Sequence, residues 1–137
     1  MSRLFFVMIK PDGVKRGLVG EIISRFEKRG FVLQSARFIP SAKTVEVIDA
    51  HYMSHSESVF YDDLIEFSLS GPVIAMIWAG DVRVARGLIG DTVPSDSKPG
   101  TIRGDFSSSM MENLIHCSAS LESAVREVEL WKPFLDF

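Results

Sequence analysis

Two short, almost unbroken runs of apolar residues most constrain how this chain can fold. They are Leu4–Ile9 and Val73–Ala79. Both are far too short to cross a bilayer, for which a helix needs about 20 apolar residues. A continuous apolar run of this length is typical of a strand that is buried inside a sheet. The sequence therefore predicts a globular fold that is built around buried strands.

The remaining segments alternate between helical and strand-like patterns. Leu18, Val19, Ile22, Ile23 and Phe26 recur at helical spacing, and Gly30 ends that helix. The other expected elements are, in chain order, a strand at 31–39, helices at 43–54 and 58–69, a strand at 73–78, a helix at 82–89, a strand at 114–118 and a helix at 120–130. Without the inserted helix pair and the final helix, this order is βαββαβ, the ferredoxin-like arrangement. We expect one α+β domain over residues 1–137, with a four-stranded antiparallel sheet and surrounding helices packed mainly on one face.

Charge and cysteine content narrow the functional classes. The net charge is −3, which argues against nucleic acid as the main partner. Residues 1–43 carry nine Lys/Arg against three Asp/Glu, and we interpret this excess as a solvated basic face. A single cysteine cannot form an intramolecular disulfide and fits a reducing compartment. With no targeting signature in the sequence, we expect a cytoplasmic protein that does not bind membranes or a specific nucleic acid.

Residues 91–112 contain Pro, Gly and Ser without a sustained period, which predicts a long loop. Long ordered loops in compact domains are usually functional. Arg103 lies among glycines in this loop, where a guanidinium suits a bidentate grip on phosphate oxygens. Lys10, after the first strand, and Arg86, before the loop, could converge with it. The glycine-rich phosphate motifs of the common nucleotide folds are absent from the sequence.

Three histidines invite competing interpretations. His51 and His55 have the spacing of paired metal ligands, but no third ligand is evident, so we expect solvent-facing or capping side chains. His116 could be structural, a base for Cys117, or a nucleophile. Neighbours on a strand point to opposite faces, so His116 and Cys117 cannot easily pair. We interpret Cys117 as a small packed residue beside the site.

Several motifs together resemble nucleoside diphosphate kinases, and the resemblance covers nearly the whole chain. They are MIKPDGV at 8–14, RGLVGEII at 16–23, SGPV at 70–73, DSKPGTIRGDF at 96–106 and NLIH at 113–116, followed by Ser118. The resemblance implies ping-pong transfer of the γ-phosphoryl group from a nucleoside triphosphate such as ATP to a nucleoside diphosphate. In that reaction His116 aligns with the nucleophile that becomes phosphohistidine.

The resemblance also implies roles for other residues. Glu127 aligns with the carboxylate that orients the histidine, Ser118 with the hydroxyl that steadies it, and Tyr52 with a tyrosine near the γ-phosphate. The implied nucleotide contacts are Lys10, Arg86, Thr92 and Arg103 for phosphates, Asn113 for a sugar hydroxyl and Phe60 for base stacking. Mg²⁺, held mainly by nucleotide phosphates rather than by protein ligands, is the implied cofactor, and a homo-oligomer, tetramer or hexamer, is the implied assembly.

The chain departs from the family's pattern at a few positions near these residues. Cys117 replaces a glycine or another very small residue, Ala119 a usual Asp, and Ser54 an Asp that commonly contacts the hydration shell of Mg²⁺. Met110 and Met111 replace smaller residues near the base. Cys117, Ala119 and Ser54 leave one alternative, a nucleotide-binding or regulatory homologue without turnover. The basic N-terminal third leaves another, a weak, non-specific nucleic-acid-binding module. The departures also leave the base and sugar preference open.

Overall fold

The computed structural model describes residues 3–40, 45–52, 61–109 and 112–137. Its strands are β1 (Leu4–Ile9), β2 (Val32–Ile39), β3 (Val73–Ala79) and β4 (Ile115–Cys117). Its helices are α1 (Pro11–Lys15), α2 (Val19–Lys28), α3 (Val45–His51), α4 (Tyr61–Ser68), α5 (Val82–Ile89), α6 (Ile102–Phe106) and α7 (Leu121–Trp131), with 3-10 turns η3 (Pro94–Asp96) and η4 (Lys132–Phe134). The order confirms the predicted α+β class.

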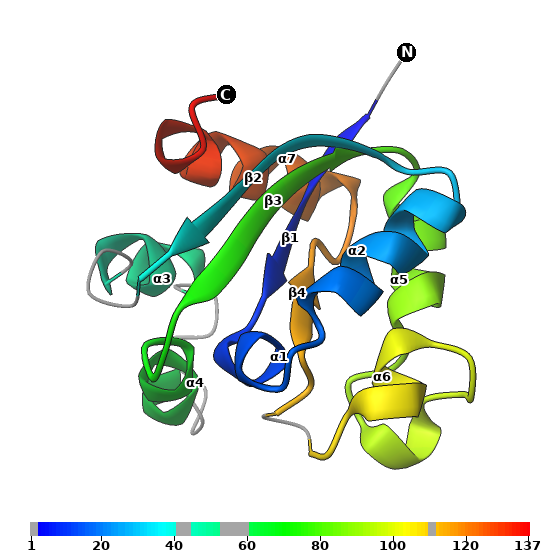
Figure 1. Cartoon of the computed structure of the whole chain (residues 1–137). Helices are drawn as coiled ribbons and strands as arrows, with labels where there is room; N and C mark the ends of the chain where they lie inside the picture. Colours follow the sequence, from blue (N-terminus) through cyan, green and yellow to red (C-terminus); the bar gives the residue numbers. More distant parts are fainter. Residues whose placement is uncertain (1–2, 41–44, 53–60, 110–111) are drawn as a thin grey trace.

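The four strands form one antiparallel sheet in the order β2-β3-β1-β4 (Figure 1). This is the strand order of the ferredoxin-like arrangement, and it confirms the predicted fold. The two apolar runs, β1 and β3, are the central strands. The short β4 pairs with β1 so that His116 lies opposite Met8. The residue of greatest chemical interest is therefore fixed to the most buried strand of the sheet.

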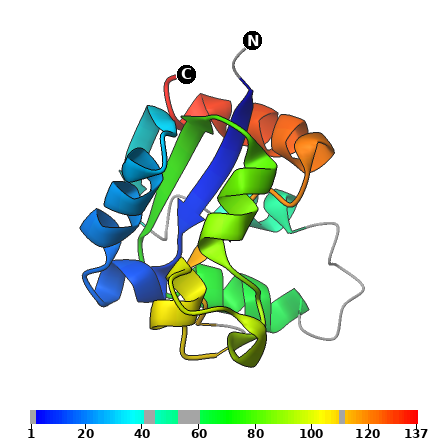
Figure 2. The same ribbon diagram turned by 90° about the vertical axis from the view of Figure 1, so that its right-hand side faces the viewer.

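Helices cover both faces of the sheet, so the expectation that they pack mainly on one face is wrong. Phe5, Val7 and Ile9 face a core shared with α2, α5 and α6, whereas Phe6 and Met8 face a second core with α3 and α7. Figures 1 and 2 show these two helical layers on either side of the strands. The physical reason lies in β1 and β3 themselves, because a strand with no polar alternation must be buried on both faces.

Two short helices were not expected. Pro11 begins α1 directly after β1, since a proline at the first helical position has its φ already set. Within the expected loop at 91–112, η3 and α6 are ordered, and the Thr101 hydroxyl caps α6 by accepting from the Gly104 N–H at 3.0 Å. The helices expected at 43–54 and 58–69 correspond to α3 and α4, but residues 53–60 lie outside the described ones. No helix in the described ranges has the length and apolar character needed to cross a bilayer.

The segment after β1 braces the segment before β4. The Lys10 N–H donates to the Leu114 carbonyl at 2.8 Å, and the Asp12 carboxylate accepts from the Leu114 N–H at 3.0 Å. Leu114 has a φ of +76°, which is uncommon for a residue other than glycine. The Ile115 N–H donates to the Asn113 carbonyl at 2.9 Å, so Leu114 is the centre of a γ-turn. This strained turn sets the direction in which β4, and with it His116, leaves the loop.

The close approach of these two segments predicts that Gly13 cannot carry a side chain. A Cβ at Gly13 would lie 2.8 Å from Ile9 Cγ2 and 2.9 Å from the Leu114 carbonyl oxygen. We expect Gly13→Ala to lower the free energy of unfolding by roughly 1–3 kcal/mol, as overpacking of a core does. Gly87→Ala is the matched control, because Gly87 lies in α5 with open space around it, and there alanine should raise stability by about 0.5–1 kcal/mol. Urea denaturation of both variants measures the difference, and equal effects would contradict this account of the brace.

Candidate active site

His116 is held by a buried carboxylate. Its Nε2 lies 2.8 Å from Oε1 of Glu127, which comes from the adjacent helix α7. Because an ionised carboxylate can only accept, this hydrogen bond assigns the proton of a neutral His116 ring to Nε2 and leaves the lone pair on Nδ1. The His116 side chain is 20% exposed, whereas that of Glu127 is 5% exposed. The histidine can therefore meet a ligand while its orienting partner stays inside.

Ser118 completes this arrangement. Its hydroxyl donates to the same Glu127 oxygen at 2.9 Å and accepts from the backbone N–H of Phe6 at 3.0 Å. Burial raises the pKa of Glu127, while the Ser118 hydrogen bond is among the contacts that lower it. The three residues to which the resemblance gives the roles of nucleophile, orienting carboxylate and hydroxyl are thus joined in one hydrogen-bonded group between β1, β4 and α7.

Cys117 faces away from this group. Its side chain belongs to the core shared with α2 and α5, on the opposite face of the sheet from Phe6 and Trp131. Burial raises the pKa of the Cys117 thiol to about 12, so almost no thiolate exists at neutral pH. A nucleophilic role requires the thiolate. The geometry agrees with the interpretation of Cys117 as a packed residue.

Arg103 is built into the turn that precedes His116. Its guanidinium donates to the carbonyls of Asn113 (3.3 Å), Ile115 (2.7 Å) and Gly90 (3.2 Å). A further contact of 3.5 Å joins it to the Thr92 hydroxyl. Arg103 is 5% exposed, and burial, together with the charge of Arg86, lowers its pKa to about 10. It therefore remains a fixed positive charge at neutral pH, beside the strand that carries His116.

Lys10 and Arg86 are two further cations near Arg103. Burial, reinforced by the charge of Arg103, lowers the pKa of Lys10 to about 8. Arg86 extends from α5 and donates to the Cys117 carbonyl at 3.2 Å. Arg103 thus lies close enough to both Lys10 and Arg86 for their charges to repel, and such a group of cations is costly in the absence of an anion. Such a cluster is therefore suited to a ligand that carries several negative charges.

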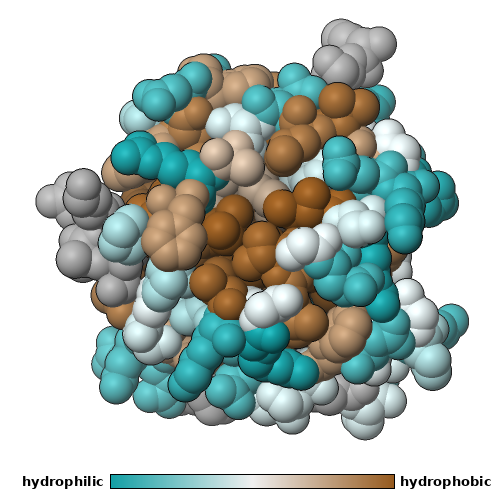
Figure 3. Space-filling model, viewed as in Figure 1, coloured by the Kyte–Doolittle hydropathy of each residue, from teal (hydrophilic) through white to brown (hydrophobic). Residues whose placement is uncertain are grey.

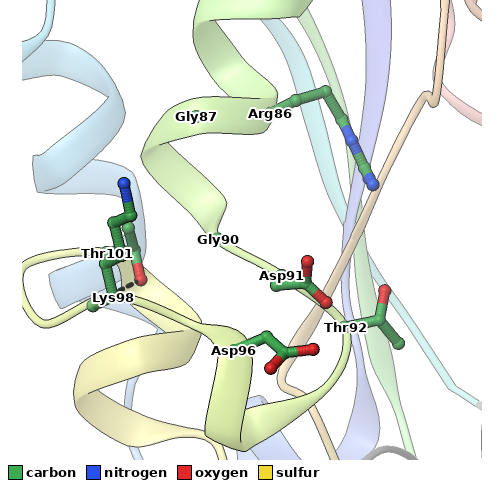
Figure 4. Close-up of a pocket in the computed structure, with 8 residues that line it drawn as sticks. All are labelled: Arg86, Gly87, Gly90, Asp91, Thr92, Asp96, Lys98 and Thr101. Carbon is green, nitrogen blue, oxygen red and sulfur yellow. Dashed lines mark hydrogen bonds between the residues drawn. The ribbon is translucent and has the colours of Figure 1, made fainter.

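A pocket of about 500 Å³ opens beside these cations, within the usual range for small-molecule sites. It is lined by Arg86, Gly87, Gly90, Asp91, Thr92, Asp96, Lys98 and Thr101. Figure 4 shows Arg86 reaching from α5 toward the strands, and Asp91 and Thr92 extending from the following loop. Through its contacts to Gly90 and Thr92, Arg103 connects this pocket to the residues around His116.

One residue of this site was misjudged. His51 was expected to face solvent or cap a helix, but it is 2% exposed, and its ring centroid lies 4.4 Å from that of His116. The physical reason is that the last turn of α3 packs against α7, where the Trp131 indole N–H donates to His51 Nδ1 at 3.1 Å. The sequence did hold one indication that His51 lies at the site. It directly precedes Tyr52, which the resemblance already assigned to the site.

Some of the other predicted residues lie near His116, and others fall outside the described part of the chain. Tyr52 is buried with its ring centroid 6.4 Å from that of His116, and burial raises its pKa to about 12. Asn113 is also buried and supplies the carbonyl that Arg103 binds. Phe60, Ser54, Met110 and Met111 lie outside the described residues, and Ala119 is exposed.

Possible metal donors fall into two sets within the described residues. Donor atoms of His51, His116 and Glu127 lie within 4.8 Å of one another, but two imidazoles do not suit Mg²⁺, which prefers oxygen. Asp91 and Asp96 offer carboxylate oxygens at the pocket. A magnesium ion that arrives with a phosphate ligand would therefore find two carboxylates on the pocket side, whereas the set behind His116 offers one carboxylate and two imidazoles.

The sequence matches known proteins over nearly its whole length. Residues 5–135 match the sequence profile of the family described as nucleoside diphosphate kinase. A nucleoside diphosphate kinase of an Exiguobacterium species is 55% identical over 128 residues, which are 92% of this chain and 91% of the relative. Nucleoside diphosphate kinase 1 of Pisum sativum is 49% identical over 135 residues, covering 97% of this chain and 89% of the relative.

Solved structures give the same answer for the fold. The apo nucleoside diphosphate kinase of Encephalitozoon cuniculi superposes with a TM-score of 0.89 at 41% identity, over 96% of this chain and 88% of that one. The halophilic nucleoside diphosphate kinase of Halobacterium salinarum, solved in complex with CDP, also gives a TM-score of 0.89, at 40% identity and the same coverage. Since the profile match extends through β1–β4 and α7, this chain belongs to the nucleoside diphosphate kinase family.

Proposed function

We propose that His116 is the residue that is phosphorylated when this chain carries out the reaction of its family. That reaction is ping-pong transfer of the γ-phosphoryl group from a nucleoside triphosphate such as ATP to a nucleoside diphosphate, through a phosphohistidine. The observation that carries the proposal is the 2.8 Å contact between His116 Nε2 and Glu127 Oε1. It supports a neutral imidazole with its lone pair on Nδ1, which is the form a nucleophile needs.

In the first half-reaction, Nδ1 of His116 attacks the γ-phosphorus in line. The Nδ1–P bond forms as the bond from phosphorus to the bridging oxygen breaks, and the nucleoside diphosphate leaves with that oxygen. Positive charge develops on the ring, and Glu127 stabilises it through Nε2–H. In the second half-reaction, a terminal oxygen of the acceptor diphosphate attacks the same phosphorus, and Nδ1 leaves with its electron pair.

We assign the phosphates to the cations. Lys10, Arg86 and Arg103 would neutralise phosphate oxygens, and the Thr92 hydroxyl would donate to one of them. The repulsion of Arg103 with Lys10 and with Arg86 supports this assignment, because an incoming polyphosphate relieves it. The fixed hydrogen bonds of Arg103 mean that its charge needs little reorganisation during transfer, which favours electrostatic stabilisation of the transition state.

Contacts to the rest of the nucleotide follow from the resemblance. Tyr52 would lie near the γ-phosphate, Asn113 would bind a sugar hydroxyl, and Phe60 would stack on the base. Every base offers a π-face, so a stacking platform accepts all of them. This physical property supports a site that takes nucleoside di- and triphosphates with little base selectivity.

We propose Mg²⁺ as the cofactor. It would be held mainly by phosphate oxygens of the nucleotide, since Mg²⁺ usually binds few protein ligands in such sites. Asp91 and Asp96 are the carboxylates that the described pocket offers on that side. The ion would supply further neutralisation of phosphate charge, beside the cations of the protein.

We also propose that residues 1–137 form one domain and that the chain assembles into a homo-oligomer, either a tetramer or a hexamer. The edge strand β2 supports self-association, because it exposes Val32 and Phe38 at 58% and 55%. Figure 3 shows hydrophobic residues gathered at the centre of the face on which β2 and β3 lie. The single free cysteine fits a cytoplasmic location, which we propose as well.

The phosphohistidine can be tested by labelling. Wild-type protein incubated with γ-labelled ATP and no acceptor should retain an acid-labile, alkali-stable phosphoryl group, as expected for a phosphoramidate. His116→Ala should retain none. Cys117→Gly is the neighbouring control and should keep phosphotransfer within about tenfold of wild type, or ~1.4 kcal/mol in the barrier. Label that survives His116→Ala, or that is lost in Cys117→Gly, would contradict the assignment.

The pKa of Lys10 predicts a basic limit for nucleotide capture. With a pKa lowered to about 8, Lys10 is charged below that pH and neutral above it, so the attraction for phosphate weakens as the pH rises. We expect kcat/KM for the nucleotide to fall above about pH 8 in the wild type. Because kcat/KM reports groups of the free enzyme, it is the quantity to measure. Lys10→Arg should keep its kcat/KM to higher pH, since a guanidinium stays protonated. Identical basic limbs in the two proteins would remove Lys10 as the cause.

A further inference from the structure

His51 takes no part in the transfer described above, yet it is buried beside His116 and Glu127. It ends α3 with 2% of its surface exposed. Its ring is nearly perpendicular to that of His116, at 84° and 4.4 Å between centroids. The ring of Phe6 lies 5.6 Å away on the strand side. A polar ring in such surroundings is costly unless its nitrogens are used.

Trp131 determines which nitrogen of His51 carries the proton. The indole N–H donates to His51 Nδ1 at 3.1 Å, and an indole nitrogen can only donate. Nδ1 therefore holds a lone pair, and the proton of a neutral His51 ring is on Nε2. Trp131 is itself fully buried and stacks on Phe6 at 4.7 Å. From the backbone side, Arg126 donates to the His51 carbonyl at 3.2 Å. The ring is thus fixed in position and in tautomer.

The carboxylate of Glu127 lies within reach of this ring. One donor atom each from His51, His116 and Glu127 lie within 4.8 Å of one another. Glu127 Oε1 already accepts from His116 and from Ser118. A buried carboxylate has lone pairs on two oxygens, and additional N–H groups nearby favour its charged form. The juxtaposition therefore places His51 where it can act on Glu127.

We propose that His51 is a positioning residue for the phosphotransfer, which rests on His116 being the phosphorylated residue. Held by Trp131, it presents its Nε2–H to the Glu127 carboxylate. It thereby keeps that carboxylate charged and aligned on Nε2 of His116. Each side chain would position the next one, in the order Trp131, His51, Glu127 and His116. Other active sites also contain a side chain that orients the nucleophile and a further residue that holds this side chain in place.

The electrostatics around Glu127 agree with this role. Burial raises the pKa of Glu127, and His51 is the strongest influence that lowers it, ahead of the Ser118 hydrogen bond. The groups that act on Glu127 from the packed elements are His51 from α3, His116 from β4, Ser118 directly after β4, Arg126 from α7 and Arg86 from α5. Loss of His51 should therefore let Glu127 keep its proton to a higher pH.

The test compares three variants under single-turnover conditions. His51→Leu removes both nitrogens, and His51→Gln keeps a neutral donor and acceptor. Ile48→Val is the matched control, because it loosens the same helix one turn earlier without touching the polar group. We expect His51→Leu to slow phosphohistidine formation roughly 10- to 100-fold, as with other groups that orient a reacting imidazole, while the dissociation constant for ADP stays within about twofold. His51→Gln should recover most of the rate, and Ile48→Val should resemble the wild type.

The pH profile separates positioning from packing. The acid limb of kcat/KM should move toward neutral pH in His51→Leu, which loses the whole influence of His51 on the pKa of Glu127. It should move less in His51→Gln, because the amide N–H replaces that influence only in part. It should stay in place in Ile48→Val. Should His51→Leu not fold, the limb of His51→Gln decides alone. An unmoved acid limb, or a loss of rate matched by an equal loss of ADP affinity, overturns the proposal. Failure of the wild type to form phosphohistidine would instead overturn the proposed function.

Discussion

One buried carboxylate oxygen links the parts of this site. Glu127 Oε1 accepts from His116 Nε2 at 2.8 Å and from the Ser118 hydroxyl at 2.9 Å, and that hydroxyl accepts in turn from the Phe6 backbone. A carboxylate can remain charged in the interior only when such contacts compensate its lost hydration. The register of β4 on β1 and the position of α7 are both needed to provide them. The chemistry proposed for His116 therefore depends on the same contacts that close the sheet at this edge.

A second constraint sets the direction in which β4 and His116 leave the preceding loop. Leu114 adopts a positive φ that costs on the order of 1–3 kcal/mol at a non-glycine residue, and the surrounding structure must hold it there. The backbone of Lys10, the carboxylate of Asp12 and the guanidinium of Arg103 all bond to this turn or its neighbours. Lys10 and Arg103 thus have two functions. They fix the start of β4, and they place positive charge beside the residue that it carries.

Sequence patterns predicted those elements whose burial can be recognised from neighbouring residues in the sequence. The runs at β1 and β3 were recognisable because a strand buried on both faces shows no alternation, although that same property should also have predicted helices on both faces. His51 was misjudged because its burial depends on α7, some 80 positions later in the sequence. The Leu114 turn was not predicted, since nothing in the residue type favours it and only the distant Asp12 and Arg103 enforce it. The gathering of Lys10, Arg86 and Arg103 could be suggested from loop positions and the resemblance, but the lowered pKa values of Lys10 and Arg103 follow only from the three-dimensional arrangement.

The claim that Glu127 dictates which nitrogen of His116 reacts has a direct measurement. Protein labelled with ¹⁵N in histidine can be phosphorylated with ATP, and the N–P connectivity of His116 can be read by NMR under alkaline conditions. The account predicts phosphate on Nδ1, because Nε2 is engaged with Glu127 at 2.8 Å. Phosphate on Nε2 would contradict it, since that nitrogen would have to leave the carboxylate before it could attack.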